Sequence, residues 1–137
     1  PEKRAILFFF GGGMVIGPDK GDAAVLRKLC FGAGCDVWFP IYPLCTEHCI
    51  TESYDMAFEC YRQMITQYGS GNVSTCGFSS GGALPEFERA CVRANVPYTV
   101  TAQKGMVHCY CMLPYYKEAK EDFAKIVEIL KKEETIR

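Results

Sequence analysis

A serine flanked by glycines is the first feature of this chain that could do chemistry. The segment Gly77-Phe78-Ser79-Ser80-Gly81 follows an apolar, β-branched run and precedes residues compatible with a helix. A strand, a sharp turn and a helix form the setting of a nucleophile elbow, with the serine at the apex of the turn. Small neighbours are needed because the backbone is strained there and approaches other chain segments closely. We therefore expect Ser79 to be a nucleophile; the alternative is a tight turn in a flavodoxin-like domain.

Two other segments could supply what a serine nucleophile needs. A hydroxyl is a weak nucleophile unless a base takes its proton, and the oxyanion formed in the reaction needs fixed N–H donors. His108 is the candidate base, and the alternative for it is a solvent-facing loop histidine. The candidate donors are the backbone N–H groups of Gly11, Gly12 and Ser80. The glycines could instead ease a turn or bind phosphate, but neither phosphate-loop pattern, GxGxxG or the P-loop, occurs here.

The elements that must position these residues follow from the hydrophobic pattern. Continuous apolar or β-branched runs predict strands, the first of them buried on both faces, and apolar residues at helical spacing predict helices. The expected strands are 5–10, 35–41, 72–78 and 98–103, and the expected helices are 20–32, 51–68, 84–95 and 115–132. We expect the first helix to end at Gly32 and Gly34, and the second to be capped by Thr51 or Ser53.

This alternation indicates an α/β fold with a mostly parallel sheet and helices on both faces. Chemistry in such sheets gathers at the carboxyl ends of the strands. The glycines, the serine turn and the His108 loop each follow a strand, so we expect them to share one edge of the sheet. The 137 residues fit a single domain spanning 1–137.

Charge and hydropathy exclude several classes of function. A net charge of -1 gives no basic surface for nucleic acid or for an anionic membrane. The longest apolar run, Ala5 to Phe10, is too short to span a bilayer, and the N-terminal residues do not resemble a secretory signal. We expect a cytoplasmic protein without a membrane span or a nucleic-acid partner; homo-oligomerisation stays open.

Nine cysteines are many for one domain, and their number is odd. Several lie inside apolar runs, where a thiol behaves as a small hydrophobic group. We interpret them as reduced thiols, because a chain of this size can build a core without disulfides. Cysteine and histidine also gather within 45–49 and 108–111, but neither group shows the CxxC pairs typical of structural zinc sites. We expect no metal and no cofactor.

Four motifs together carry a resemblance to a known family. They are GGG at 11–13, YPLCTEH at 42–48, GFSSGG at 77–82 and GMVH at 105–108. In this order they resemble the hormone-sensitive-lipase-like branch of α/β-hydrolases, over most of the chain. The resemblance implies an esterase or lipase-like enzyme that cleaves a small-molecule ester through an acyl-serine, without a cofactor. It also implies Ser79 and His108 as catalytic residues, with the oxyanion hole formed by Gly11, Gly12 and Ser80.

Three features depart from the family pattern. Phe10 stands where the family commonly has a histidine before the glycines, and Phe78 stands where an acidic residue often precedes the nucleophile. The acid of the triad should lie between the serine and the histidine, yet the only acidic residues there are Glu86 and Glu88. Both fall on an expected helix that runs away from the elbow, so the triad acid stays unknown.

The chain is also short between the elbow and the histidine. We hypothesise that a segment near Ala83 and Leu84 is absent, and a long Cα–Cα distance there would show a break. In a continuous chain, His108 would be displaced by roughly 10 Å, or two strand spacings. Two functions therefore stay open: a serine esterase, and a hydrolase-like binding or regulatory protein that lacks the triad acid.

Overall fold

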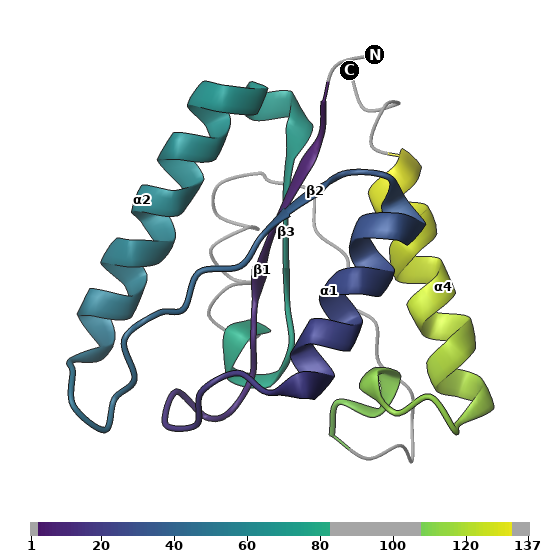
Figure 1. Cartoon of the computed structure of the whole chain (residues 1–137), viewed down its shortest axis with the longest axis horizontal. Coiled ribbons are helices and arrows are strands. Elements are labelled where there is room, and N and C mark those ends of the chain that lie inside the picture. The colour runs from purple at the N-terminus through teal and green to yellow at the C-terminus, as the bar shows by residue number, and fades with distance from the viewer. Residues whose placement is uncertain (1–2, 83–107, 133–137) are drawn as a thin grey trace, which may run out of the picture.

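A short parallel sheet forms the centre of the fold (Figure 1). The structure is a computed structural model and describes residues 3–82 and 108–132. Its strands are β1 (Ala5–Phe9), β2 (Asp36–Trp38) and β3 (Val73–Gly77), in the order β2-β1-β3. Its helices are α1 (Lys20–Ala33), α2 (Ile50–Tyr68) and α4 (Lys117–Lys132), with short 3-10 turns at Ser70–Asn72, Ser79–Gly82 and Tyr110–Met112.

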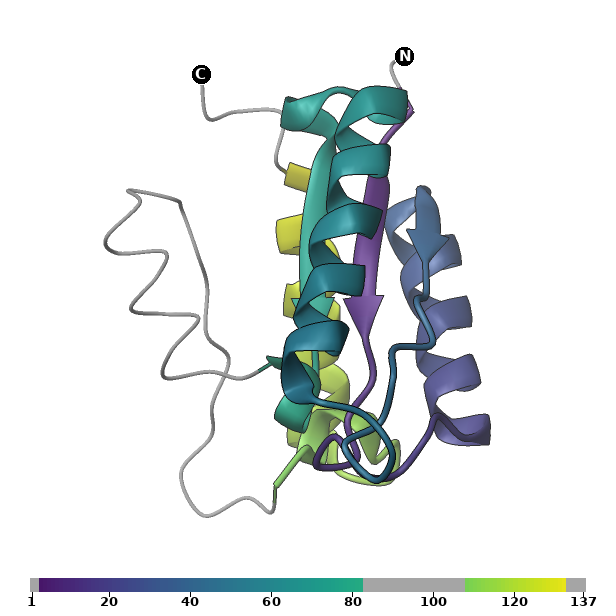
Figure 2. The same ribbon diagram turned by 90° about the vertical axis from the view of Figure 1, so that its left-hand side faces the viewer.

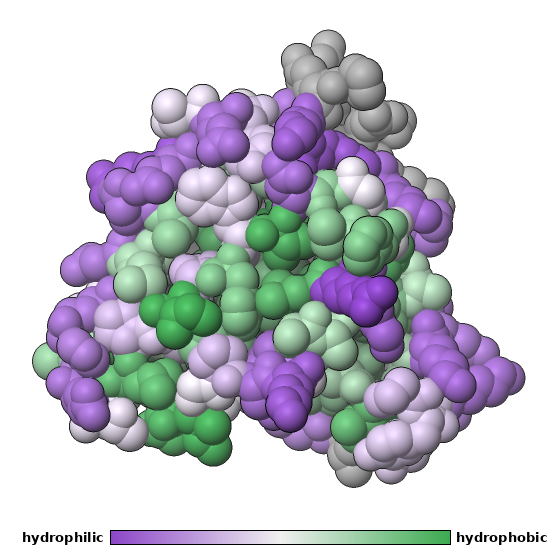
Figure 3. All heavy atoms as spheres, viewed as in Figure 1, coloured by the Kyte–Doolittle hydropathy of each residue, from purple (hydrophilic) through white to green (hydrophobic). Residues whose placement is uncertain are grey.

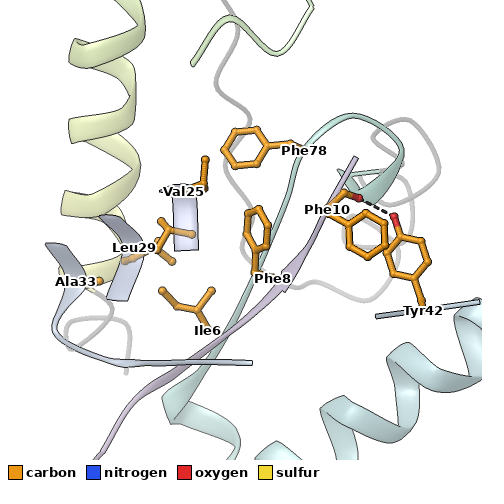
Figure 4. Packing of buried hydrophobic residues seen from close by; sticks show 9 residues of the cluster. Ile6, Phe8, Phe10, Val25, Leu29, Ala33, Tyr42 and Phe78 are labelled. Carbon is orange, nitrogen blue, oxygen red and sulfur yellow. Dashed lines mark hydrogen bonds between the residues drawn. The ribbon is translucent and has the colours of Figure 1, made fainter. Parts of the chain in front are cut away.

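The central strand β1 is buried on both faces, as its unbroken apolar sequence predicts. Ile6, Phe8 and Phe10 point into a core shared with α1 and α4, which Figure 4 shows from close by. Ala5 and Leu7 point the other way and pack against α2. Alternate residues of one strand therefore anchor helices on opposite faces. Figure 1 shows α2 on one side of the sheet and α1 and α4 on the other, and in Figure 2 α2 lies in front of the strands. The α/β class and the parallel sheet with helices on both faces are confirmed within the described residues.

The register of the sheet aligns the ends of β1 and β3. Phe9 pairs with Gly77 in the parallel ladder, so the segments leaving both strands start side by side. Continuing the same register by two residues places Gly11 beside Ser79. The shared edge that the sequence predicts for the glycines and the serine turn is therefore present.

Several element boundaries differ from their predictions. The second strand is only three residues long, because it pairs with β1 alone among the described residues and loses its partner after Leu7. Helix α1 passes through Gly32 and ends at Gly34, which has a left-handed φ of 66°. Gly32 is instead a contact point, since a Cβ there would lie 3.1 Å from Val127 of α4. Its role is close helix packing, not termination.

The start of α2 also corrects the prediction. Cys49 is the N-cap, and the Glu52 carboxylate accepts a hydrogen bond from the Cys49 N–H at 2.9 Å. Thr51 lies inside the helix, and the hydroxyl of the buried Ser53 donates to the Pro43 carbonyl at 2.6 Å. The prediction failed because Ser53 ties α2 to the preceding loop and so cannot cap the helix.

Three predictions lie outside the described residues. They are the helix 84–95, the strand 98–103 and the chain break near residues 83 and 84. Within 3–82 and 108–132, no helix combines the length and the hydropathy needed to cross a bilayer. On the face shown in Figure 3, hydrophobic residues lie at the surface with hydrophilic ones around them.

Candidate active site

The Ser79 hydroxyl and the His108 imidazole meet at the carboxyl edge of the sheet. Nε2 of His108 lies 2.7 Å from Oγ of Ser79, although the residues are 29 positions apart in sequence. His108 is thus within hydrogen-bonding reach of Ser79. The displacement of roughly 10 Å was expected only for a continuous chain, and the residues near 83 and 84 that decide continuity lie outside the described ranges.

The turn that carries Ser79 is strained, as a nucleophile elbow requires. Ser79 adopts a φ of 55°, in the left-handed region that residues with a Cβ rarely occupy. The turn is closed by a hydrogen bond from the Gly81 N–H to the Phe78 carbonyl at 3.0 Å. A Cβ on Gly81 would lie 2.3 Å from the Phe10 carbonyl oxygen, so this position accepts only glycine. The strain and the close approach together hold the serine at the apex.

The glycine loop after β1 lies directly against the serine. A Cβ on Gly11 would lie 3.0 Å from Cβ of Ser79, so bare backbone faces the hydroxyl there. Gly12 has a φ of 107°, and its carbonyl accepts hydrogen bonds from the N–H groups of Val15 and Ile16. The loop is thus folded back on itself beside the site. This arrangement brings two of the three predicted oxyanion-hole residues to the edge that carries Ser79.

Tyr42, in the segment between β2 and α2, holds the backbone just after β1. Its ring stacks on Phe10 with centroids 4.1 Å apart, and its hydroxyl donates to the Phe10 carbonyl at 2.6 Å (Figure 4). Burial raises the pKa of Tyr42 to about 12, so the hydroxyl stays a donor at neutral pH. The sequence placed Tyr42 in a motif without giving it a role. The structure shows that it holds the backbone just before the glycines.

The third predicted donor is the backbone N–H of Ser80, the residue after Ser79. The Ser80 hydroxyl is buried near Tyr42, and it has no hydrogen-bond partner within the described part of the chain. The side chain therefore points away from solvent. Its position leaves the backbone of Ser80 as the part that could contribute to the site.

Cys109 and Tyr110 connect the histidine to the rest of the fold. Cys109 has a φ of 56° and contacts Ser79; burial raises the pKa of its thiol, while hydrogen bonds with the Ser79 side chain and backbone oppose the shift. Tyr110 is buried and donates its hydroxyl to Asp122 of α4. Sequence reasoning missed both roles. The sequence carried a signal for Asp122, because helical spacing puts it on the same face of α4 as Ala119, Ile126 and Leu130.

No carboxylate of the described residues forms a hydrogen bond with the His108 ring. Glu86 and Glu88, the acidic residues between serine and histidine, lie outside the described residues. The second histidine, His48, lies 3.0 Å from the Glu52 carboxylate at the start of α2, in a turn where the His48 N–H donates to the Leu44 carbonyl. The eight cysteines within the described ranges are free thiols, and no group of three metal-ligating side chains occurs there.

Comparisons with known proteins agree with this geometry. A sequence profile described as α/β-hydrolase fold matches residues 6–94, which include the glycine loop and the elbow. A protein provisionally classed as an esterase from Staphylococcus aureus is 28% identical, with a TM-score of 0.61 over 69% of this chain and 32% of its own. No curated protein matches the sequence.

Two more distant structures share the fold. Carboxyl esterase 2 from Tuber melanosporum is 20% identical, with a TM-score of 0.54 over 70% of this chain and 34% of its own. An arylesterase is 22% identical, with a TM-score of 0.56 over 77% of this chain and 41% of its own. The chain thus spans about a third of the first two of these structures and two fifths of the third. From the profile match and these esterase neighbours, the chain belongs to the α/β-hydrolase fold family, in its hormone-sensitive-lipase-like esterase branch.

Proposed function

We propose that the protein is a serine hydrolase that cleaves carboxylic esters of small molecules through an acyl-serine intermediate. The observation that carries this proposal is the 2.7 Å contact between Nε2 of His108 and Oγ of Ser79. At this distance the imidazole can accept the hydroxyl proton as the oxygen attacks a carbonyl. The esterase neighbours support the same class of reaction.

The reaction proceeds in two steps. Oγ of Ser79 attacks the ester carbonyl while Nε2 of His108 takes the hydroxyl proton and then gives it to the leaving alcohol. Water, deprotonated by the same nitrogen, attacks the acyl-serine; the bond to Oγ breaks, His108 returns the proton to Oγ of Ser79, and the carboxylic acid is released. The oxyanion of each tetrahedral intermediate is bound by the backbone N–H groups of Gly11, Gly12 and Ser80. The folded glycine loop beside Ser79 supports this assignment.

Covalent labelling tests the proposal most directly. A fluorophosphonate should add once, and mass spectrometry should locate the adduct on Ser79. Ser79→Ala should abolish labelling, and His108→Ala should slow it by at least about a thousandfold because the hydroxyl loses its base. Hydrolysis of short-chain nitrophenyl esters should fall in acid, where a protonated imidazole accepts no proton. Absence of an adduct under conditions that label a control esterase would refute the proposal.

The chain offers matched controls for both substitutions. Ser70 is an exposed serine of a different turn, and His48 is the other histidine of the chain. Ser70→Ala and His48→Gln should label at the rate of the wild type. A slowed reaction in either variant would mean that loss of labelling reports general damage to the fold.

A second function is favoured by the surroundings of the His108 ring within the described residues. Because no described carboxylate orients His108, a hydrolase-derived binding or regulatory protein is the alternative. Losing the orienting acid costs about four orders of magnitude in turnover, so slow labelling with negligible ester hydrolysis would favour it. For either function we propose a cytoplasmic location, which the abundance of free thiols supports.

A further inference from the structure

A buried polar cluster lies two residues beyond His108. Asp122 of α4 is 1% exposed, and its carboxylate accepts a hydrogen bond from the buried Tyr110 hydroxyl. Its other oxygen lies 2.6 Å from Nζ of Lys125, whose side chain is 62% exposed. A carboxylate is costly to bury and is kept only where it is well paired. The free-energy cost of burying the Asp122 carboxylate indicates that its hydrogen bond with Tyr110 has a role beyond core packing.

Helix α4 is a fixed support for this bond. The Arg4 guanidinium, just before β1, donates to the carbonyls of Leu130 and Lys131 at 2.9 Å each. In the middle of α4, Val127 packs against Gly32 so closely that a Cβ on the glycine would lie at 3.1 Å. The helix is thus held at its last turn by the start of β1 and along its length by α1. Asp122 therefore offers a rigid acceptor.

The segment between His108 and Tyr110 is too tight to absorb a displacement of the tyrosine. Cys109 has a left-handed φ of 56°, and its carbonyl accepts from the Met112 N–H at 3.0 Å. The Leu113 N–H donates to the Tyr110 carbonyl at 2.8 Å. A shift of the Tyr110 ring must therefore move the histidine.

From these contacts we propose that Tyr110 and Asp122 are positioning residues for His108: the buried hydrogen bond between them fixes the His108 turn to α4 and holds Nε2 within reach of Ser79. The inference rests on the proposed function for its catalytic consequence. In this proposal, α4, which follows His108 in sequence, anchors the turn that carries the histidine.

Tyr110→Phe tests the inference, because it removes one hydroxyl and keeps the buried ring. We expect kcat for a nitrophenyl ester, per site titrated with fluorophosphonate, to fall about 10- to 100-fold, since an error of about 1 Å at the reacting atoms costs up to about 100-fold. KM should change less than twofold, because Tyr110 touches no substrate. Asp122→Asn keeps an acceptor for the tyrosine and should retain more activity than Asp122→Leu.

Tyr115→Phe is the matched control, since Tyr115 is 71% exposed and lies before the same helix. Its kcat should equal that of the wild type. If Tyr110→Phe lowers only the melting temperature and leaves kcat per titrated site within twofold of the wild type, the tyrosine stabilises the fold without positioning His108, and the inference fails.

Nitrogen NMR of the His108 ring separates this failure from failure of the proposed function. With signals assigned through His48→Gln, Tyr110→Phe should shift or broaden both ring-nitrogen resonances, and Tyr115→Phe should not. Unchanged resonances would overturn the positioning role even in an active enzyme. If the wild type takes no fluorophosphonate, the esterase proposal fails, while a changed His108 spectrum in Tyr110→Phe still supports the anchor.

Discussion

Gly81 shows at the scale of one residue why small side chains surround Ser79, the proposed nucleophile. A Cβ there would lie 2.3 Å from the Phe10 carbonyl and 2.5 Å from the Phe9 carbonyl, both of which are backbone atoms that cannot rotate away. Gly81→Ala should therefore force β1 and the elbow apart. We expect a loss of about 3 kcal/mol in the free energy of unfolding, at the upper end for overpacking, measured by urea denaturation.

Gly71 provides the matched substitution. A Cβ at this position has no neighbour within 4 Å, so Gly71→Ala should change the free energy of unfolding by less than about 0.5 kcal/mol. Equal losses in the two variants would show that the clash at Gly81 is relieved by a shift of the strand. The requirement for glycine would then come from the chemistry of the site.

The sequence predicts the strained turn at Ser79, because small neighbours in a set pattern indicate it. The catalytic roles of Ser79 and His108 stay proposals. Tyr110 escapes such reasoning, because its role depends on a partner twelve positions away on a helix. Tyr42 escapes it for the same reason, since its hydroxyl acts on a carbonyl 32 positions earlier.

At the scale of elements, the start of α1 depends on one side chain. Asp19 accepts hydrogen bonds from the N–H groups of Gly21 and Asp22 at 2.6 and 3.2 Å, while the Asp22 carboxylate accepts from the Asp19 N–H at 2.9 Å. This reciprocal pair satisfies N–H groups that the first turn leaves without partners. Asp19→Ala should cost about 1 kcal/mol in the free energy of unfolding.

Asp55→Ala is the comparison, because Asp55 is exposed within α2 and alanine is a better helix former there. Thermal denaturation should show a lower melting temperature for Asp19→Ala alone. A similar drop in both variants would mean that loss of a negative charge, and not loss of the cap, destabilises the protein.

Element types followed from hydrophobic periodicity, whereas element ends did not. In α2, Met64 and Tyr68 are both buried, since a spacing of four residues returns to the same face of a helix. The cap of α2 could not be read in this way. Ser53 resembles a cap in sequence, but tertiary structure uses its hydroxyl to bind the Pro43 carbonyl. The local preference of serine for a cap position is overridden here, because the hydroxyl binds a backbone carbonyl outside the helix.

At the scale of the whole molecule, three elements are tied together by one carboxylate. Asp36, at the start of β2, accepts hydrogen bonds from the Tyr68 hydroxyl at 2.8 Å and from Nζ of Lys3 at 3.1 Å. The Trp38 indole in turn donates to the Tyr68 oxygen at 3.3 Å. The end of α2, the edge strand and the residues before β1 thus share one polar network. Periodicity gave no sign of it, because it joins residues far apart in sequence.

This network predicts how stability depends on pH. The hydrogen bond from Tyr68 and then the hydrogen bond from Lys3 lower the pKa of Asp36 in the folded state. A lowered pKa means that the carboxylate stabilises the fold above its unfolded pKa, near about 3.9, and that this contribution is lost as the pH falls through the folded value. The difference in unfolding free energy between wild type and Asp36→Asn should be constant from about pH 7 to 5 and shrink below about pH 4.

The order of the two causes sharpens that prediction. The hydrogen bond from the Tyr68 hydroxyl is the largest single cause of the lowered pKa of Asp36, ahead of the hydrogen bond from Lys3. We therefore expect Tyr68→Phe to remove more of the acid-dependent difference than Lys3→Met. Urea denaturation of both variants at several pH values between 3 and 7 measures how their unfolding free energies depend on pH. A larger effect of Lys3→Met would mean that the ion pair, 78% exposed at the lysine, dominates despite its screening by water. The hydroxyl should dominate instead, because Tyr68 is buried against β1 and its geometry does not depend on a flexible side chain.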